Sequence, residues 1–173
     1  MAIHRLRQGL RALFAFSQSV DYPLAARYLT SEQLALFGQM RRGEQLHSLN
    51  VLRAVLAQEA VTPPDLALAA LLHDVGKSRY PLALWQKTIA VLARQFAPPI
   101  FDRLSRGDPR RWWSRAFVVH VCHPAWSAEL LAQTNAAADA IWLVAHHQDA
   151  ANQWHNHYLF FLLQRLQAAD DTN

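Results

Sequence analysis

The chain has 173 residues, enough for one domain with a substantial core. Hydrophobic residues make up 52% of it and charged residues only 17%, below the roughly 25% of an average soluble domain. The net charge of +4 suits an anionic substrate, but the basic residues are scattered and give no strong signal for nucleic-acid binding.

Residues 1–27 are the first predicted element, a helical extension in front of the core. Leu6, Leu10 and Leu13 recur at helical spacing between arginines. The apolar stretch is too short for a signal peptide, and no run approaches the ~20 residues of a membrane span. Cys122 is the only cysteine, so no internal disulfide can form. We therefore expect a cytoplasmic protein without a membrane span.

Two helices are predicted between residues 30 and 60. Thr30 and Gln33 form a capping-box pattern that begins the first, and Gly43 is expected to break it. The second runs from His47 to about residue 60. His47 and Val51 are four residues apart, so the imidazole lies on the apolar, inward face.

The next predicted helix, residues 63–74, is apolar nearly all round, which indicates a position in the middle of a bundle. Thr62 is its expected cap, Pro63 its first residue, and Gly76 its stop. His73 and Asp74 emerge at its end. Burying an imidazole and a carboxylate there is costly unless a partner satisfies them, and a metal ion is the usual partner.

The second half of the chain predicts further helices separated by two irregular segments. In the run Arg110–Trp113, tryptophan packing beneath arginine stems is favoured over base stacking or phosphate binding. We expect an all-α fold, a single compact helical bundle over residues 1–173 with its metal-binding core in 28–171. The predicted helices are 81–97, 123–134, 137–147 and 158–170. The predicted irregular segments are 101–115, a loop that can include a short helix, and 149–157.

The pattern His47, His73-Asp74 and Asp170 resembles the HD-domain superfamily of metal-dependent phosphohydrolases. Leu72-His73-Asp74-Val75-Gly76-Lys77 is similar to the central motif of that family. His123 and the residues that follow it, Pro124 to Leu131, resemble a segment of the HD-GYP phosphodiesterases, which belong to the subgroup with two metals. The resemblance implies the helical bundle of the HD-domain type.

The same resemblance implies a ligand set for two divalent ions, drawn from Mn, Fe, Mg, Co and Zn. Asp74 would be the bridging carboxylate. His47, His73 and Asp170 would complete the first metal site, and His123 with His146 would hold the second. His147 is either a further ligand or a contact to the substrate or to another ligand, and the sequence leaves these roles open.

The implied reaction is hydrolysis of a phosphoester in a small phosphorylated substrate, a nucleotide by preference, through a metal-bridging hydroxide. Asp74 and Lys77 would be the catalytic residues. Lys77 would also bind a phosphate oxygen, with Arg79 as a weaker candidate for that contact and His147 as a third.

Two departures from the family pattern count against cyclic di-GMP hydrolysis and a third metal. The Gly-Tyr-Pro segment after the histidine pair is missing, and Gly43 stands where some relatives carry a glutamate. Two alternatives to hydrolysis remain, a diiron HD-fold oxygenase acting on a small polyol or phosphonate and a non-catalytic regulatory module. Because the chain has a high content of apolar residues, an interface between copies of the chain in a homo-oligomer is a further alternative.

Overall fold

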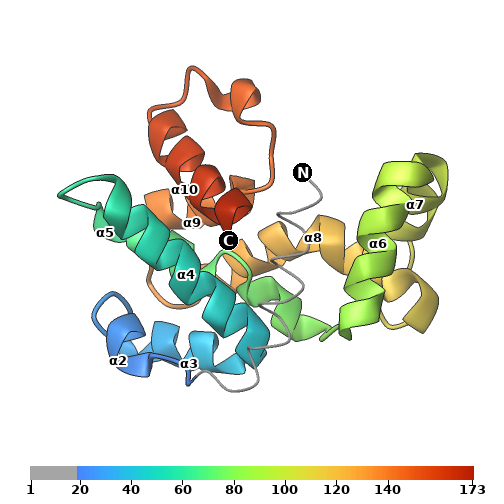
Figure 1. Ribbon diagram of the computed structural model, residues 1–173, viewed down its shortest axis with the longest axis horizontal. Helices are drawn as coiled ribbons and strands as arrows, with labels where there is room; N and C mark the ends of the chain where they lie inside the picture. Colours follow the sequence, from blue (N-terminus) through green and yellow to red (C-terminus); the bar gives the residue numbers. More distant parts are fainter. Residues whose placement is uncertain (1–18) are drawn as a thin grey trace.

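The structure is a computed structural model that describes residues 19–173, and every regular element in that range is a helix (Figure 1). The all-α prediction is therefore confirmed, while the predicted N-terminal helix falls mostly outside the described residues. The elements are α2 (Tyr22–Ala25), α3 (Ser31–Gln39), α4 (Arg42–Gln58), α5 (Pro64–Leu72), the 3₁₀ helix η1 (Val75–Arg79), α6 (Leu84–Phe96), α7 (Pro98–Ser105), α8 (Trp112–Ala132), α9 (Ala138–His146), the 3₁₀ helix η2 (Ala151–Trp154) and α10 (Phe160–Thr172).

The start of α3 follows the predicted capping box. The Thr30 side chain accepts a hydrogen bond from the Gln33 amide, and the Gln33 side chain accepts one from the Thr30 amide. The predicted break at Gly43 is wrong. Met40 and Arg41 adopt extended backbone angles and separate the two helices, so Gly43 lies in the first turn of α4.

Helix α5 begins one residue later than predicted, at Pro64. Pro63 is extended rather than helical, with φ −56° and ψ 137°, because a residue before proline is disfavoured in the helical region. All residues from Leu66 to Leu72 are buried, which confirms that this helix occupies the centre of the bundle.

The predicted irregular segment 101–115 is largely helical. Pro98 and Pro99 begin α7 instead of starting a loop, since the first turn of a helix needs no backbone N–H donor. Helix α8 then begins at Trp112, eleven residues before the predicted start at His123, and it continues through Pro124. Only residues 106–111 separate the two helices.

Two hydrophobic clusters divide the core. The larger one gathers buried side chains from α3, α4, α5, α9 and α10, and the smaller one lies among α6, α7 and the first half of α8. Figure 1 shows α8 extending from the centre of the molecule toward α6 and α7, which lie at one end. Within residues 19–173, no helix is both long and apolar enough to cross a membrane.

Candidate metal centre

The centre is built on the turn that follows α5. His73 closes the helix and Asp74 precedes η1, and both side chains are buried. The Gly76 amide in η1 donates a 2.7 Å hydrogen bond to Ser127 Oγ on α8. A Cβ at Gly76 would lie 2.7 Å from the Ser127 nitrogen and would also meet the His123 carbonyl oxygen. The glycine therefore allows η1 to dock closely against α8, beside His123.

One ligand group consists of His47, His73 and Asp74, whose ligand atoms lie within 4.8 Å of one another. Asp170 joins it from α10, with its Oδ1 atom 2.8 Å from His47 Nε2 and 3.6 Å from His73 Nε2. The side chains of His47 and Asp170 are 25% and 28% exposed, so this group faces solvent on one side.

A second ligand group consists of Asp74, His123 and His147, all buried. Asp74 Oδ1 lies 3.2 Å from His123 Nε2 and 3.8 Å from His147 Nε2, while Asp74 Oδ2 lies 3.7 Å from His73 Nε2. The two carboxylate oxygens of Asp74 thus face different histidines, and this residue belongs to both groups.

Backbone carbonyls orient the three buried imidazoles. The Nδ1 atoms of His73, His123 and His147 lie 3.1, 2.9 and 2.8 Å from the carbonyl oxygens of Ala70, Val119 and Val144. A carbonyl can only accept, so each Nδ1 carries a proton, and Nε2 is the ring nitrogen that can bind a metal ion at the centre.

Pro124 supplies a second acceptor for His123. Proline has no N–H to occupy the carbonyl four residues earlier in the helix, so the His120 carbonyl is left without its usual helical partner. His123 Nδ1 lies 3.1 Å from this oxygen. The ring of His123 is therefore held by two carbonyls of its own helix.

The electrostatics of the centre differ between its histidines. Burial would lower the pKa of His73, but the nearby carboxylates of Asp74 and Asp170 outweigh burial and raise that pKa to about 9. Burial would raise the pKa of Asp74, yet Lys77 and His73 hold it well below its usual range. Burial and then the charges of His73 and His123 lower the pKa of His147 to about 3, so its ring stays neutral.

These features fit a metal ion. His73 Nε2 is buried and has no hydrogen-bond partner, although it points toward two carboxylates. Neutral imidazole nitrogens and carboxylate oxygens are the donors that Zn, Mn, Fe, Co and Ni sites use. The residues could hold one ion in each group, with Asp74 shared between them.

The histidine pair after α9 is divided between two environments. His147 belongs to the second ligand group, whereas His146 Nδ1 lies 2.7 Å from Asp149 Oδ2 and its ring packs against Trp142 and Trp154. The prediction that His146 partners His123 is therefore not supported by the geometry. Consecutive helical residues point about 100° apart, so only one of the two can face the centre.

The two side chains predicted to bind phosphate, Lys77 and Arg79, lie in different environments. Lys77 Nζ lies 2.6 Å from Asp74 Oδ2, and the carboxylate raises the pKa of this lysine against the effect of burial. Arg79 instead pairs with Glu129 at 2.7 Å and lies over the Trp126 ring. Lys77 is placed at the centre, and Arg79 is engaged with α8.

The sequence did not identify Lys87 as a neighbour of the centre. Its ammonium pairs with Glu44 of α4, and both residues line a small cavity of about 10 Å³ together with Arg41, Asp74 and Lys77. No spacing signal links residues 44 and 87, which belong to different helices. Glu44 therefore faces Lys87 and stands outside both ligand groups.

Comparison with known families agrees with this geometry. The HD domain family model matches residues 46–172, a span that includes His47, the His73-Asp74 pair, His123, His147 and Asp170. No curated protein and no solved structure shows a significant match to the chain. The match covers well over half of the chain, and the chain belongs to the HD domain family.

Proposed function

We propose that the protein is a metal-dependent phosphohydrolase that uses two divalent metal ions. The observation that carries this proposal is the shared Asp74: its two oxygens face separate histidine groups, and three buried imidazoles place their Nε2 atoms near it. A carboxylate common to two ligand groups is the arrangement that two adjacent metals require.

When bound, divalent cations would acidify a water molecule and stabilise negative charge on a phosphoryl group. The residues of the chain would hold and orient the reactants. Asp74 and the histidines fix the cations, and Lys77 stands beside them with a raised pKa that keeps it charged. Because the cations would satisfy Asp74, Lys77 would become available to a phosphate oxygen.

The cations beside Asp74 suit a small phosphorylated substrate, which must open the site because the cavity of about 10 Å³ there holds no more than a water molecule. Arg41, Lys77 and Lys87 all line this cavity, and Glu44 is the carboxylate that pairs with Lys87. We expect an anionic substrate to displace Glu44 from Lys87 and to enter from the side where His47 and Asp170 are partly exposed. A nucleotide or a related small phosphoester has the charge for this site.

The first experiment is elemental analysis of protein purified without added metal or chelator, followed by turnover of phosphomonoesters and phosphodiesters. About two Mn, Mg, Co or Zn ions per chain with phosphate release would support the proposal. Two irons with an oxygen-sensitive spectrum and no phosphoester turnover would replace it with the oxygenase. Failure to bind metal after reconstitution would favour a non-catalytic module.

His147→Ala is expected to remove one of the two metal ions, because it deletes one of the two histidines in the buried group. Loss of a ligand should weaken binding at that position by roughly a hundredfold or more, while His146→Ala should leave metal content near that of the unsubstituted protein. Metal titration by calorimetry compares the two variants. Equal losses from both would contradict the assignment of His147.

Lys77→Met is expected to lower kcat/KM by roughly a hundredfold while leaving both metals bound, since the ammonium contacts Asp74 without being a ligand. Arg79→Met is the matched control, because Arg79 pairs with Glu129. Steady-state kinetics and the metal content of the two variants test this expectation. Unchanged kinetics in Lys77→Met would exclude this lysine from phosphate binding.

A further inference from the structure

Helix α6 presents its apolar side to solvent. Four residues at spacings of four, three and four share one face of the helix, and their side chains are large and apolar. The opposite side packs on the smaller core cluster through the small residues Ala90 and Ala93. The outward residues and their exposed fractions are Trp85 (56%), Ile89 (46%), Leu92 (46%) and Phe96 (74%).

Large apolar side chains are also exposed on the two helices that follow α6. Ile100 at the start of α7 is 57% exposed, and Trp112 and Trp113 at the start of α8 are 66% and 48% exposed. These helices lie together at one end of the molecule (Figure 1). The four α6 residues form one apolar stripe, and an apolar stripe marks a candidate interaction site, whereas isolated exposed apolar residues do not. We refer to residues 84–115 as the α6–α8 corner.

The α6–α8 corner also carries the positive charge of the described chain. It contains seven basic residues and two acidic ones, whereas residues 19–83 and 116–173 together contain seven basic and eleven acidic residues. The basic residues are Lys87, Arg94, Arg103, Arg106, Arg110, Arg111 and Arg115, and the acidic ones are Asp102 and Asp108. The partner of this surface should therefore be negatively charged.

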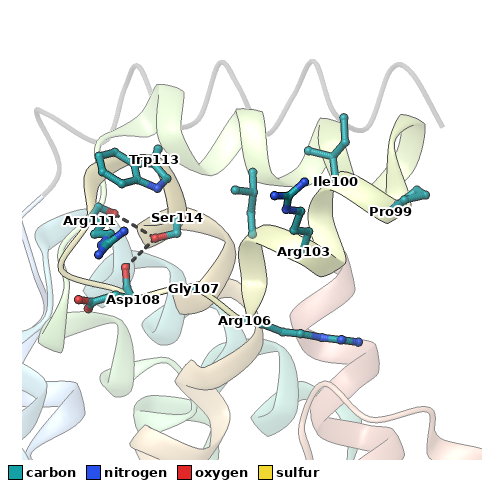
Figure 2. Close-up of a pocket in the computed structure, with 10 residues that line it drawn as sticks. Pro99, Ile100, Arg103, Arg106, Gly107, Asp108, Arg111, Trp113 and Ser114 are labelled. Carbon is teal, nitrogen blue, oxygen red and sulfur yellow. Dashed lines mark hydrogen bonds between the residues drawn. The ribbon is translucent and has the colours of Figure 1, made fainter.

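A cavity of about 870 Å³ opens within the corner, and three arginines line it. Figure 2 shows Arg103 and Arg106 on the α7 side of the cavity and Arg111 with Trp113 on the α8 side. Within residues 19–173, neither Arg103 nor Arg106 forms an ion pair with a carboxylate. The cavity is large enough for an anionic headgroup and has guanidinium groups available to bind one.

Charge disfavours two occupants of this face. A second copy of the chain in a symmetric dimer would bring two basic corners together. Residues 1–18 carry Arg5, Arg7 and Arg11 without any acidic residue, so they too would add like charge. The phosphates of a nucleic acid would pair with the arginines, but the aliphatic side chains of Ile89 and Leu92 cannot stack on its bases. A lipid surface supplies negative charge and an apolar medium together.

We propose that the α6–α8 corner binds the surface of an anionic lipid bilayer. The apolar stripe of α6 enters the boundary between headgroups and acyl chains, and the arginines of α7 and α8 contact lipid phosphates. The inference is independent of the phosphohydrolase proposal, because lipid binding requires neither a metal ion nor turnover.

The test is co-sedimentation of the full-length protein with vesicles of phosphatidylcholine alone or of an equal mixture with phosphatidylglycerol. We expect binding to the anionic vesicles, weakened by salt, and little binding to the neutral ones. Arg103→Gln with Arg106→Gln should weaken binding about 30-fold, since each basic residue near the surface contributes roughly fivefold. Arg27→Gln with Arg53→Gln removes the same charge outside the corner and should have a smaller effect.

The apolar contribution has its own matched pair of variants. Phe96→Ser should lower the partition coefficient by about tenfold or more, because it removes an aromatic side chain from the apolar medium. Phe161→Ser on α10 is the control, with a phenylalanine of nearly the same exposure, 73% against 74%. Both sites are on the surface, so circular dichroism should show native helical content in each variant.

Several results would overturn the proposal. These are no binding to either vesicle, equal binding to both compositions, or equal effects of Phe96→Ser and Phe161→Ser. Loss of binding on neutralising Arg5, Arg7 and Arg11, without any loss from Phe96→Ser, would assign the membrane contact to the N-terminal segment. Binding of a single-stranded oligonucleotide in preference to anionic vesicles would assign the corner to nucleic acid.

Discussion

Asp74→Ala is expected to remove most bound metal and to lower kcat/KM by roughly a thousandfold or more, because the substitution takes a ligand from both metal positions at once. Each oxygen of this carboxylate faces a different set of histidines. No other carboxylate of the described residues belongs to both groups, so no neighbour can replace it. The helical content should remain, since Asp74 lies in a turn and not within an α-helix.

Elemental analysis, activity and far-ultraviolet circular dichroism measure these three expectations. Asp171→Ala is the matched control, because Asp171 is an exposed neighbour of the predicted ligand Asp170. It should keep both metals and near-normal activity. Two metals retained in Asp74→Ala would end the proposal that this residue bridges them.

Metal binding should also stabilise the whole bundle. The candidate ligands come from α4, the turn after α5, α8, the end of α9 and α10, so bound ions would cross-link five helical segments. A ligand that binds only the folded state raises stability by RT ln(1 + [L]/Kd), about 2.7 kcal/mol at a hundredfold excess over Kd. Thermal unfolding should shift upward with Mn²⁺ or Co²⁺ in the unsubstituted protein, and this shift should be lost in Asp74→Ala.

Gly76→Ala is expected to destabilise the protein by about 3 kcal/mol, or roughly 10 °C in Tm. The added Cβ would meet the backbone of His123 and Ser127, which belongs to a buried helix and cannot move aside. The 3₁₀ helix η1 would have to separate from α8, and the hydrogen bond from the Gly76 amide to Ser127 Oγ would be strained or lost.

The same displacement should reach the metal centre. Asp74 is two residues before Gly76, and its Oδ1 atom lies 3.2 Å from His123 Nε2. Moving η1 away from α8 lengthens this separation, so weaker metal binding should accompany the loss of stability.

Gly38→Ala provides the control for both effects. A Cβ at Gly38 meets nothing within 4 Å, and the residue is helical, so this variant should be more stable by about 0.5–1 kcal/mol. Chemical denaturation and metal titration of the two alanine variants measure both effects. A Gly76→Ala protein as stable as Gly38→Ala would show that the close approach of η1 to α8 is dispensable.

Most of the helical pattern could be predicted because local rules governed it. The capping box at Thr30, the fully apolar α5 and the placement of His73 and Asp74 at its end all depend on residues within one or two turns. The main error was the segment 101–115, most of which is helical. Pro98 and Pro99 were interpreted as the end of the helix 81–97, which is correct for α6, and the helix that contains Pro124 was expected to begin at His123. In the structure the first two begin α7 and the third lies inside α8.

The choice between His146 and His147 could have been made from the sequence. Leu143 and Val144 are buried in α9, and His147 follows them by four and three residues, so it continues their face. His146 instead follows Trp142 by four residues and packs against it. The spacing to neighbouring apolar residues carried the information, while the resemblance to a family motif did not distinguish the two histidines.

Contacts between distant elements could not be predicted. The pairing of Lys87 with Glu44 depends on how α6 meets α4, and no local rule places residues 43 positions apart in contact. The outward orientation of α6 is a second case. Its apolar residues indicate an amphipathic helix, and the usual inference places that face in the core. Only the packing of Ala90 and Ala93 shows that the helix is turned the other way.

Pro124 is unfavourable for the stability of α8, but it leaves a carbonyl free for a candidate metal ligand. A change such as Pro124→Ala restores a backbone N–H that would claim the His120 carbonyl, and it would be selected in any search for greater thermal stability. That carbonyl is also an acceptor for His123 Nδ1. Directed evolution for stability alone should therefore drift toward variants that fold better and position this imidazole less firmly, unless metal affinity is selected at the same time.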